Sequence, residues 1–116
     1  MKLLLSLIVL LALSLAAADV SGKWSAEVDV AGNHATPQFT FKQDGDKITG
    51  TYKGMLGEAP VTGTVDGKKI SWVVKASFNG DAVTIVYTGT LESDTLIKGT
   101  VDFAGQADGT FTAKKE

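Results

Sequence analysis

His34 is the only histidine of the chain, which makes it the first candidate for acid–base chemistry. A catalytic triad needs a base that a carboxylate orients and that serves a nucleophile. Asp29 lies close to His34 in the sequence, but no nucleophile motif accompanies the two residues. Because that constellation is missing, we interpret His34 as a loop histidine without a catalytic role.

The carboxylates offer two other kinds of chemistry, and their positions favour neither. Asp44-Gly45-Asp46 contains oxygen ligands for calcium, but the spacing of a twelve-residue calcium loop is absent and a tight turn explains the three residues. Glycoside hydrolysis needs two carboxyl groups that point into one cleft. The acidic residues of the extended segments instead fall on the polar face of their strands: Glu27, Asp29, Asp66, Glu92 and Asp102.

The composition excludes further classes of function. The chain has no cysteine, so thiol catalysis, cysteine-based zinc sites and iron–sulfur clusters are excluded. Its 11 basic residues, none of them arginine, face 13 acidic ones, and this balance argues against binding to phosphate backbones. We therefore predict a protein that is not an enzyme, with no cofactor, no metal site and no nucleic-acid partner.

The first eighteen residues predict an export signal. Lys2 supplies the positive start, residues 3–15 form a leucine-rich apolar run, and Ala16-Ala17-Ala18 offers the small residues that signal peptidase needs. The run is short for a transmembrane helix. We predict cleavage after Ala18, a secreted or periplasmic location, and a single mature domain at residues 19–116 without membrane contact. An uncleaved anchor is the alternative.

Beyond this segment, one five-residue pattern repeats along the chain. It alternates apolar, polar, small, polar and apolar residues, which is the period of a half-buried β-strand. The pattern occurs at residues 48–52, 61–65, 74–78, 87–91, 97–101 and 107–111. No helical period of apolar residues appears. Together with the turn residues between them, these segments predict eight strands: 22–30, 37–43, 47–53, 60–66, 69–78, 81–92, 96–103 and 109–115.

The turn residues also predict how the strands pair. Two-residue turns are expected at 44–45, 67–68 and 79–80, a three-residue turn at 93–95, a five-residue loop at 104–108, and longer loops at 54–59 and around 32–34. This register aligns one row of residues across the sheet: Gly63, Trp72, Tyr87, Val101 and Phe111. A slip of one residue would turn every face inside out, so the agreement supports the pairing.

All aromatic residues of the chain fall on one face of these strands. They are Trp24, Phe39, Phe41, Tyr52, Trp72, Phe78, Tyr87, Phe103 and Phe111. No helix is expected to cover that face, so the sheet must close on itself or fold into a sandwich to bury it. The successive hairpins and the even number of strands favour closure. We therefore predict an all-β fold, an eight-stranded antiparallel up-and-down barrel in which strand 22–30 pairs with strand 109–115.

Two stretches resemble known barrel families. Gly22-Lys23-Trp24 resembles the Gly-x-Trp opening of lipocalins and avidins, and residues 44–52 are similar to the second hairpin of avidins. The resemblance implies an eight-stranded meander barrel with a small ligand in its mouth. It does not imply biotin, because Gly54 stands where avidins have a serine. The chain also resembles small exported bacterial β-domains.

The apolar interior has two interpretations. In the first, inward glycines leave room for a small apolar ligand: Gly50, Gly63, Gly89, Gly99 and Gly109. The binding residues would then be Trp24, Phe39, Tyr52, Trp72, Tyr87 and Phe103. In the second, the core is filled and the chain is an interaction module that could use Val73 and Val86 on its outer face. Binding of a small apolar molecule is the leading prediction, and the oligomeric state is left open.

Overall fold

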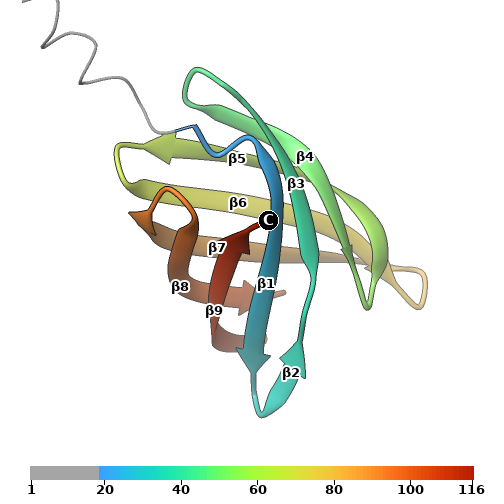
Figure 1. Cartoon of the computed structure of the whole chain (residues 1–116). Helices are drawn as coiled ribbons and strands as arrows, with labels where there is room; N and C mark the ends of the chain where they lie inside the picture. The colour runs from blue at the N-terminus through green and yellow to red at the C-terminus, as the bar shows by residue number, and fades with distance from the viewer. Residues whose placement is uncertain (1–18) are drawn as a thin grey trace, which may run out of the picture.

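Extended strands make up most of residues 19–116, the part of the chain that the computed structural model describes (Figure 1). The predicted leader, with its cleavage site after Ala18, lies outside these residues. The strands are β1 (Gly22–Val30), β2 (Asn33–Ala35), β3 (Gln38–Asp44), β4 (Lys47–Gly54), β5 (Gly57–Asp66), β6 (Lys69–Phe78), β7 (Asp81–Ser93), β8 (Leu96–Phe103) and β9 (Ala107–Lys115). Over this range, no helix is long and apolar enough to span a membrane.

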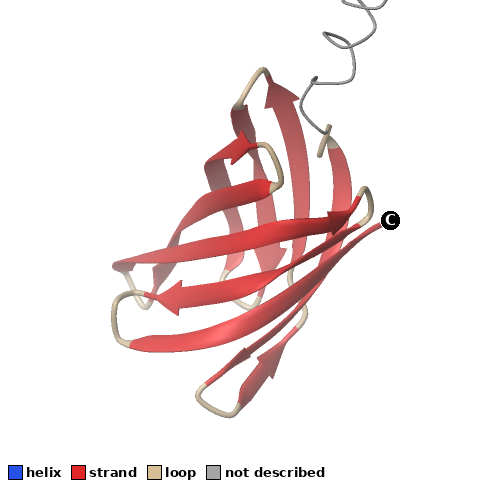
Figure 2. Cartoon of the chain, turned by 90° about the vertical axis from the view of Figure 1, so that its left-hand side faces the viewer, coloured by secondary structure: helices blue, strands red, loops and turns tan. Residues whose placement is uncertain are grey.

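The strands close into a barrel. From β3 to β9 each strand pairs antiparallel with the next one in the chain, and β1 pairs with both β3 and β9. The β1–β9 ladder runs from the pair of Trp24 and Lys115 to the pair of Val30 and Gly109. Figure 2 shows the strands curving around a common interior, with the turns gathered at the two ends. The predicted eight-stranded up-and-down barrel is therefore confirmed, with β2 as one additional short strand.

The additional strand β2 replaces the predicted loop around residues 32–34. Val28 of β1 lies opposite Ala35 of β2, and Trp24 lies opposite Phe39 of β3, so β2 and β3 continue one another along β1. The turn is made by Ala31 and Gly32, both with positive φ. The polar residues of β2 are typical of a loop, which is why the sequence predicted one. In the structure, the backbone N–H and C=O groups of β2 find hydrogen-bond partners on β1, and this pairing makes the segment a strand.

The predicted register is confirmed in the centre of the sheet. Trp72 lies opposite Tyr87, and Gly63 lies opposite Trp72. Asn79 and Gly80 form the predicted two-residue turn, and both have the positive φ that a type I′ turn requires.

Four further connections differ from the prediction. The β3–β4 turn is Gly45–Asp46 rather than 44–45, and β4 and β5 are joined by a two-residue turn at Met55 and Leu56 instead of a loop at 54–59. A bulge between Leu91 and Ser93 shortens the β7–β8 turn. The β8–β9 loop covers only 104–106, so Phe111 lies opposite Gly99 and the central row ends at Gly109. Strand faces are unchanged, because inward residues still meet inward residues across each ladder.

One end of the barrel is sealed by residues that precede β1. Val20 is buried there, and its amide donates a hydrogen bond to Gln43 Oε1 at 2.8 Å. The indole Nε1 of Trp24 donates to the carbonyl oxygen of Val20 at 2.9 Å. Ile48, Ile70 and Ile97 are almost completely buried in the same core. This end is closed by side chains and by the chain itself.

The middle of the barrel is filled by aromatic rings that pack against Trp72. Tyr87 stacks on it with a centroid distance of 5.1 Å and an interplanar angle of 9°. Phe39, Phe41 and Phe111 meet it edge-on at 5.3, 5.0 and 5.3 Å. Such offset and edge-on arrangements are the favoured ones for aromatic pairs.

The inward glycines do not leave empty space, contrary to the first of the two interpretations of the interior. A Cβ atom on Gly63 would lie 2.7 Å from the Cβ of Trp72 and against the carbonyl oxygen of Ser71. A Cβ would overlap a main-chain oxygen of the neighbouring strand at each of the other positions as well: Gly50, Gly89, Gly99 and Gly109. These glycines allow strands to approach closely where the sheet bends.

Candidate ligand-binding site

A cavity of about 500 Å³ occupies the end of the barrel opposite Val20. Four turns surround it: those that join β1 to β2, β4 to β5, β6 to β7 and β8 to β9. Its lining is mostly apolar and comprises Val28, Val30, Ala31, Asn33, His34, Ala35, Pro37, Tyr52, Met55, Leu56, Phe78, Ile85, Tyr87, Val101, Phe103 and Ala107. The barrel is therefore packed in one half and open in the other.

Tyr87 forms the floor of this cavity. It lies further along β7 from the Asn79-Gly80 turn than Ile85, the other β7 residue of the lining. Only 2% of its surface is exposed. Trp72 lies against one face of the ring, and Phe39 and Phe111 meet it edge-on at 5.2 and 5.3 Å. The floor is therefore held in place by close packing on several sides.

Tyr52 lines one wall of the cavity, and Gly54 gives it room. A Cβ atom on Gly54 would lie 2.5 Å from the hydroxyl oxygen of Tyr52. The side chain therefore extends along β4 towards the turn at Met55 and Leu56, and the glycine at position 54 leaves space for its hydroxyl.

The rim of the cavity combines exposed apolar side chains with one polar pair. Met55 and Phe78 are 82% and 56% exposed on the tips of two hairpins. His34 of β2 lies opposite Asp29 of β1, and its Nδ1–H donates a hydrogen bond to Asp29 Oδ1 at 2.9 Å. Both side chains of this pair are solvent-exposed.

Two groups of the lining have shifted ionisation. Burial raises the pKa of the Tyr87 hydroxyl above its ordinary value, with a smaller contribution from the charge of Tyr52. The hydrogen bond to Asp29 and then the charge of that carboxylate raise the pKa of His34. No lysine, aspartate or glutamate is among the lining residues, and the one basic side chain among them is that of His34, which lies exposed at the rim.

Of the six residues predicted to bind ligand, the structure brings three to the cavity. Tyr52, Tyr87 and Phe103 line it. Trp24, Phe39 and Trp72 are not part of the lining and are at most 1% exposed, so they belong to the packed interior. The alternation of residues along the strands identified the inward face correctly. It carries no information on depth along the barrel axis, and depth is what separates the three cavity residues from the three packed ones.

The sequence pattern did not predict that four rim residues belong to the site: Met55, Leu56, Phe78 and His34. A signal for Met55 was present, because a large apolar residue stands beside a turn where polar residues are usual. His34 carried no such signal, because its place at the rim depends on the pairing of β2 with β1.

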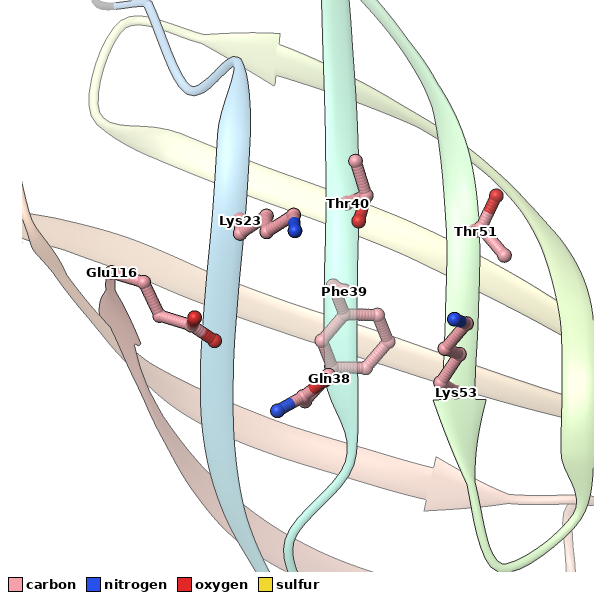
Figure 3. A pocket seen from close by; sticks show the side chains of 7 residues that line it. All are labelled: Lys23, Gln38, Phe39, Thr40, Thr51, Lys53 and Glu116. Carbon is pink, nitrogen blue, oxygen red and sulfur yellow. The ribbon is translucent and has the colours of Figure 1, made fainter.

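A second hollow of about 120 Å³ lies on the outer surface, between β1, β3 and β4 and the end of the chain. Figure 3 shows its side chains, which are mostly polar and include Lys23, Gln38, Thr51, Lys53 and Glu116. The buried Phe39 belongs to the inner face of β3. Within residues 19–116, no group of three His, Cys, Asp or Glu side chains comes together that could hold a metal ion.

No protein-family profile and no curated protein sequence matches the chain. Several solved structures are similar to it. A redesigned β-barrel aligns with a TM-score of 0.73 and 14% identity, over 86% of this chain and 96% of that one. A de novo designed fluorescence-activating β-barrel aligns with a TM-score of 0.67 and 12% identity, over 83% and 93%. The redesigned barrel mFAP1, bound to DFHBI, aligns with a TM-score of 0.64 and 15% identity, over 83% and 94%. At these identities the likeness shows the fold alone.

Proposed function

We propose that this chain is exported and binds a small apolar molecule in the open half of its barrel, without catalysing a reaction. The observation that carries the proposal is the cavity of about 500 Å³, which is lined by apolar side chains above an aromatic floor. Ligand pockets are typically concave, mostly apolar and roughly 300–1,000 Å³ in volume, with few polar groups.

The packed half of the barrel supports this function by making the cavity rigid. Trp72, Phe39 and Phe111 fix the ring of Tyr87, so a ligand meets a floor that is already ordered. Such preorganisation reduces the entropy that binding must overcome. The alternative interpretation is a barrel whose core is completely filled. It fits the half that Val20 closes, but not the half that contains the cavity.

The similar solved structures support the same capacity. Redesigned barrels that share this fold have been solved with DFHBI bound, at 14–15% identity to this chain. We extend the proposal to a lipocalin-like relationship, because Trp24 of the Gly-x-Trp segment anchors the sealed end of the barrel through its bond to Val20.

A binding function is favoured over catalysis by the chemistry of the lining. His34 and Asp29 form a base–carboxylate pair, but the lining contains no serine, threonine or cysteine that could act as a nucleophile beside them. Both members of the pair lie exposed at the rim, where water competes for their hydrogen bonds.

The neutral fluorophore N-phenyl-1-naphthylamine tests the proposal. We expect its emission to rise on binding to the protein and to saturate at one molecule per chain. Ile85→Trp should abolish the rise, because Ile85 faces the cavity and the larger side chain would fill it. Val86→Trp is the matched control, since it introduces the same side chain one residue away on the outer face. Saturable binding that survives Ile85→Trp would contradict the proposal.

Export is tested separately. We expect protein recovered from outside the cytoplasm to have the intact mass of a chain that begins at Asp19. An exported chain that retains Met1 would contradict the cleavage site.

A further inference from the structure

Tyr87, at the floor of the cavity, carries a polar hydroxyl group. The ring is 2% exposed and is fixed by three aromatic neighbours, so the hydroxyl has little freedom to seek a partner elsewhere. No hydrogen bond joins it to another residue within 19–116, and within that range Trp72 Nε1 is the one side-chain polar atom that is both enclosed and without a partner. The Tyr87 hydroxyl is therefore open to the cavity, where it can donate its hydrogen to water or to a ligand atom that replaces the water.

We propose that the occupant is a compact, uncharged aromatic molecule whose inner end carries a hydrogen-bond acceptor, and that Tyr87 donates its hydroxyl hydrogen to that acceptor. This inference rests on the proposed function and narrows it to a class of ligand.

We infer that the ligand is uncharged from the side chains that line the cavity. It contains no lysine, aspartate or glutamate, and its one histidine lies at the rim and is already paired with Asp29. A charged group carried to the floor would lose its hydration without gaining a counter-charge. Burial also raises the pKa of Tyr87, so its hydroxyl remains a donor across the neutral range.

We infer that the ligand is compact from the limited depth of the cavity. The rings of Phe39 and Trp72, next to Tyr87, fill the middle of the barrel, so a long flexible chain has no continuation beyond the floor. The lining favours a ring instead. Tyr52 and Phe103 provide aromatic walls, and at the rim Phe78 adds a further ring and Met55 a polarisable thioether.

Three competitors of bound N-phenyl-1-naphthylamine test the ligand class on the unmodified protein. We expect 2-acetylnaphthalene to displace it more strongly than 2-dodecanone, which is a methyl ketone with the same number of carbon atoms but a flexible chain. We also expect 2-naphthoate, which is charged at pH 8, to bind at least about tenfold more weakly than the ketone. Equal or better binding of the chain ketone or of the carboxylate would overturn the assigned class.

Tyr87→Phe tests the hydrogen bond. The measured quantity is the affinity of 2-acetylnaphthalene divided by that of 2-ethylnaphthalene, which lacks the acceptor. We expect this ratio to fall about fivefold in Tyr87→Phe, the factor that one net hydrogen bond gives. Thr88→Val is the control, because it removes a hydroxyl from the adjacent residue on the exposed outer face. An unchanged ratio in Tyr87→Phe, or the same fall in Tyr52→Phe instead, would overturn the assignment to Tyr87.

Infrared spectroscopy of the unmodified protein gives an answer that does not depend on any variant. We expect the carbonyl stretch of bound 2-acetylnaphthalene to lie at lower frequency than in hexane. A hexane-like frequency would overturn the hydrogen bond. If N-phenyl-1-naphthylamine does not bind at all, the proposed function itself fails; if it binds and only the ratio or the frequency disagrees, the function stands and this inference fails.

Discussion

Trp24 and Trp72 are two equally buried indoles in different polar surroundings. Both are 0% exposed. Trp24 donates its N–H to the carbonyl of Val20, whereas the Nε1 of Trp72 has no hydrogen-bond partner among residues 19–116. The indole of Trp24 therefore holds the segment at Val20 in place, whereas the indole of Trp72 contributes through packing alone.

This difference predicts unequal effects of one substitution. Trp24→Phe should lower the free energy of unfolding by about 1–3 kcal/mol more than Trp72→Phe, because only the first leaves the carbonyl of Val20 without its donor. Both variants leave a cavity of similar size, so the volume change cancels in the comparison. Urea unfolding measures both values, and equal losses would show that the bond to Val20 contributes nothing.

His34 predicts a pH-dependent contribution at the rim. Because Asp29 raises its pKa in the folded state, protonated His34 stabilises the fold below pH 6.5, and this contribution is lost as the pH rises through the folded-state pKa. In NMR titrations, we expect the His34 pKa to lie above 6.5 and to fall towards that value in Asp29→Asn. Glu27→Gln should lower it less, since Glu27 is the weaker influence. Equal effects of the two substitutions would contradict the geometry.

At the scale of the strands, close approach between β5 and β6 depends on Gly63. Its missing side chain allows Trp72 and the carbonyl of Ser71 to lie directly against it. The residue is not in a left-handed conformation, so the constraint is one of space.

Gly63→Val should therefore destabilise the barrel. Overpacking typically costs about 1–3 kcal/mol, and the better β-propensity of valine offsets up to about 1 kcal/mol of that. We expect the overpacking to prevail, because the obstructing atoms include backbone that cannot rotate away. Thr62→Val, on the exposed outer face of the same strand, is the control. Urea denaturation of the two variants decides the question, and a Gly63→Val protein as stable as its parent would refute the crowding.

The strands themselves were largely predictable, and the depth of the site was not. Alternation and the Asn79-Gly80 turn identified the inward face and the pairing of Trp72 with Tyr87, because both depend on local periodicity. The loop at 54–59 was wrong because cross-strand pairing continues to Gly54 and Gly57, which local composition does not reveal. The alternation of residues along each strand placed Trp24 and Phe103 on the same inward face, but it gives no information on depth along the barrel axis. Trp24 is enclosed in the packed core, whereas Phe103 lines the cavity.

At the scale of the molecule, the ladder between β1 and β9 holds the barrel together. It pairs residues along β1 from Trp24 to Val30, and it leaves the inner faces of both strands, including Phe111 and Ala113, fully inside. Without β9, β8 and β1 would become open edges and the aromatic interior would meet water.

A chain that ends at Gly105 should consequently lose cooperative folding. We expect it to show no single thermal transition by circular dichroism and to elute as aggregates in size-exclusion chromatography. Removal of Glu116 alone is the control, since it deletes one exposed side-chain hydrogen bond to Ser25 and one backbone bond to Lys23. A cooperative, monomeric chain without β9 would mean that closure is dispensable.

The packed half and the open half of the barrel should differ in how well the fold tolerates substitutions. Changes around Trp24 or Ile97 disturb a filled core, and most of them should be lost to unfolding. Changes at Met55 or Phe78 alter exposed hairpin tips and should leave the fold intact. Under the proposed function, substitutions at the rim would exchange one ligand preference for another while the packed half of the barrel stays the same. A library randomised at the rim should yield mostly folded members with divergent binding.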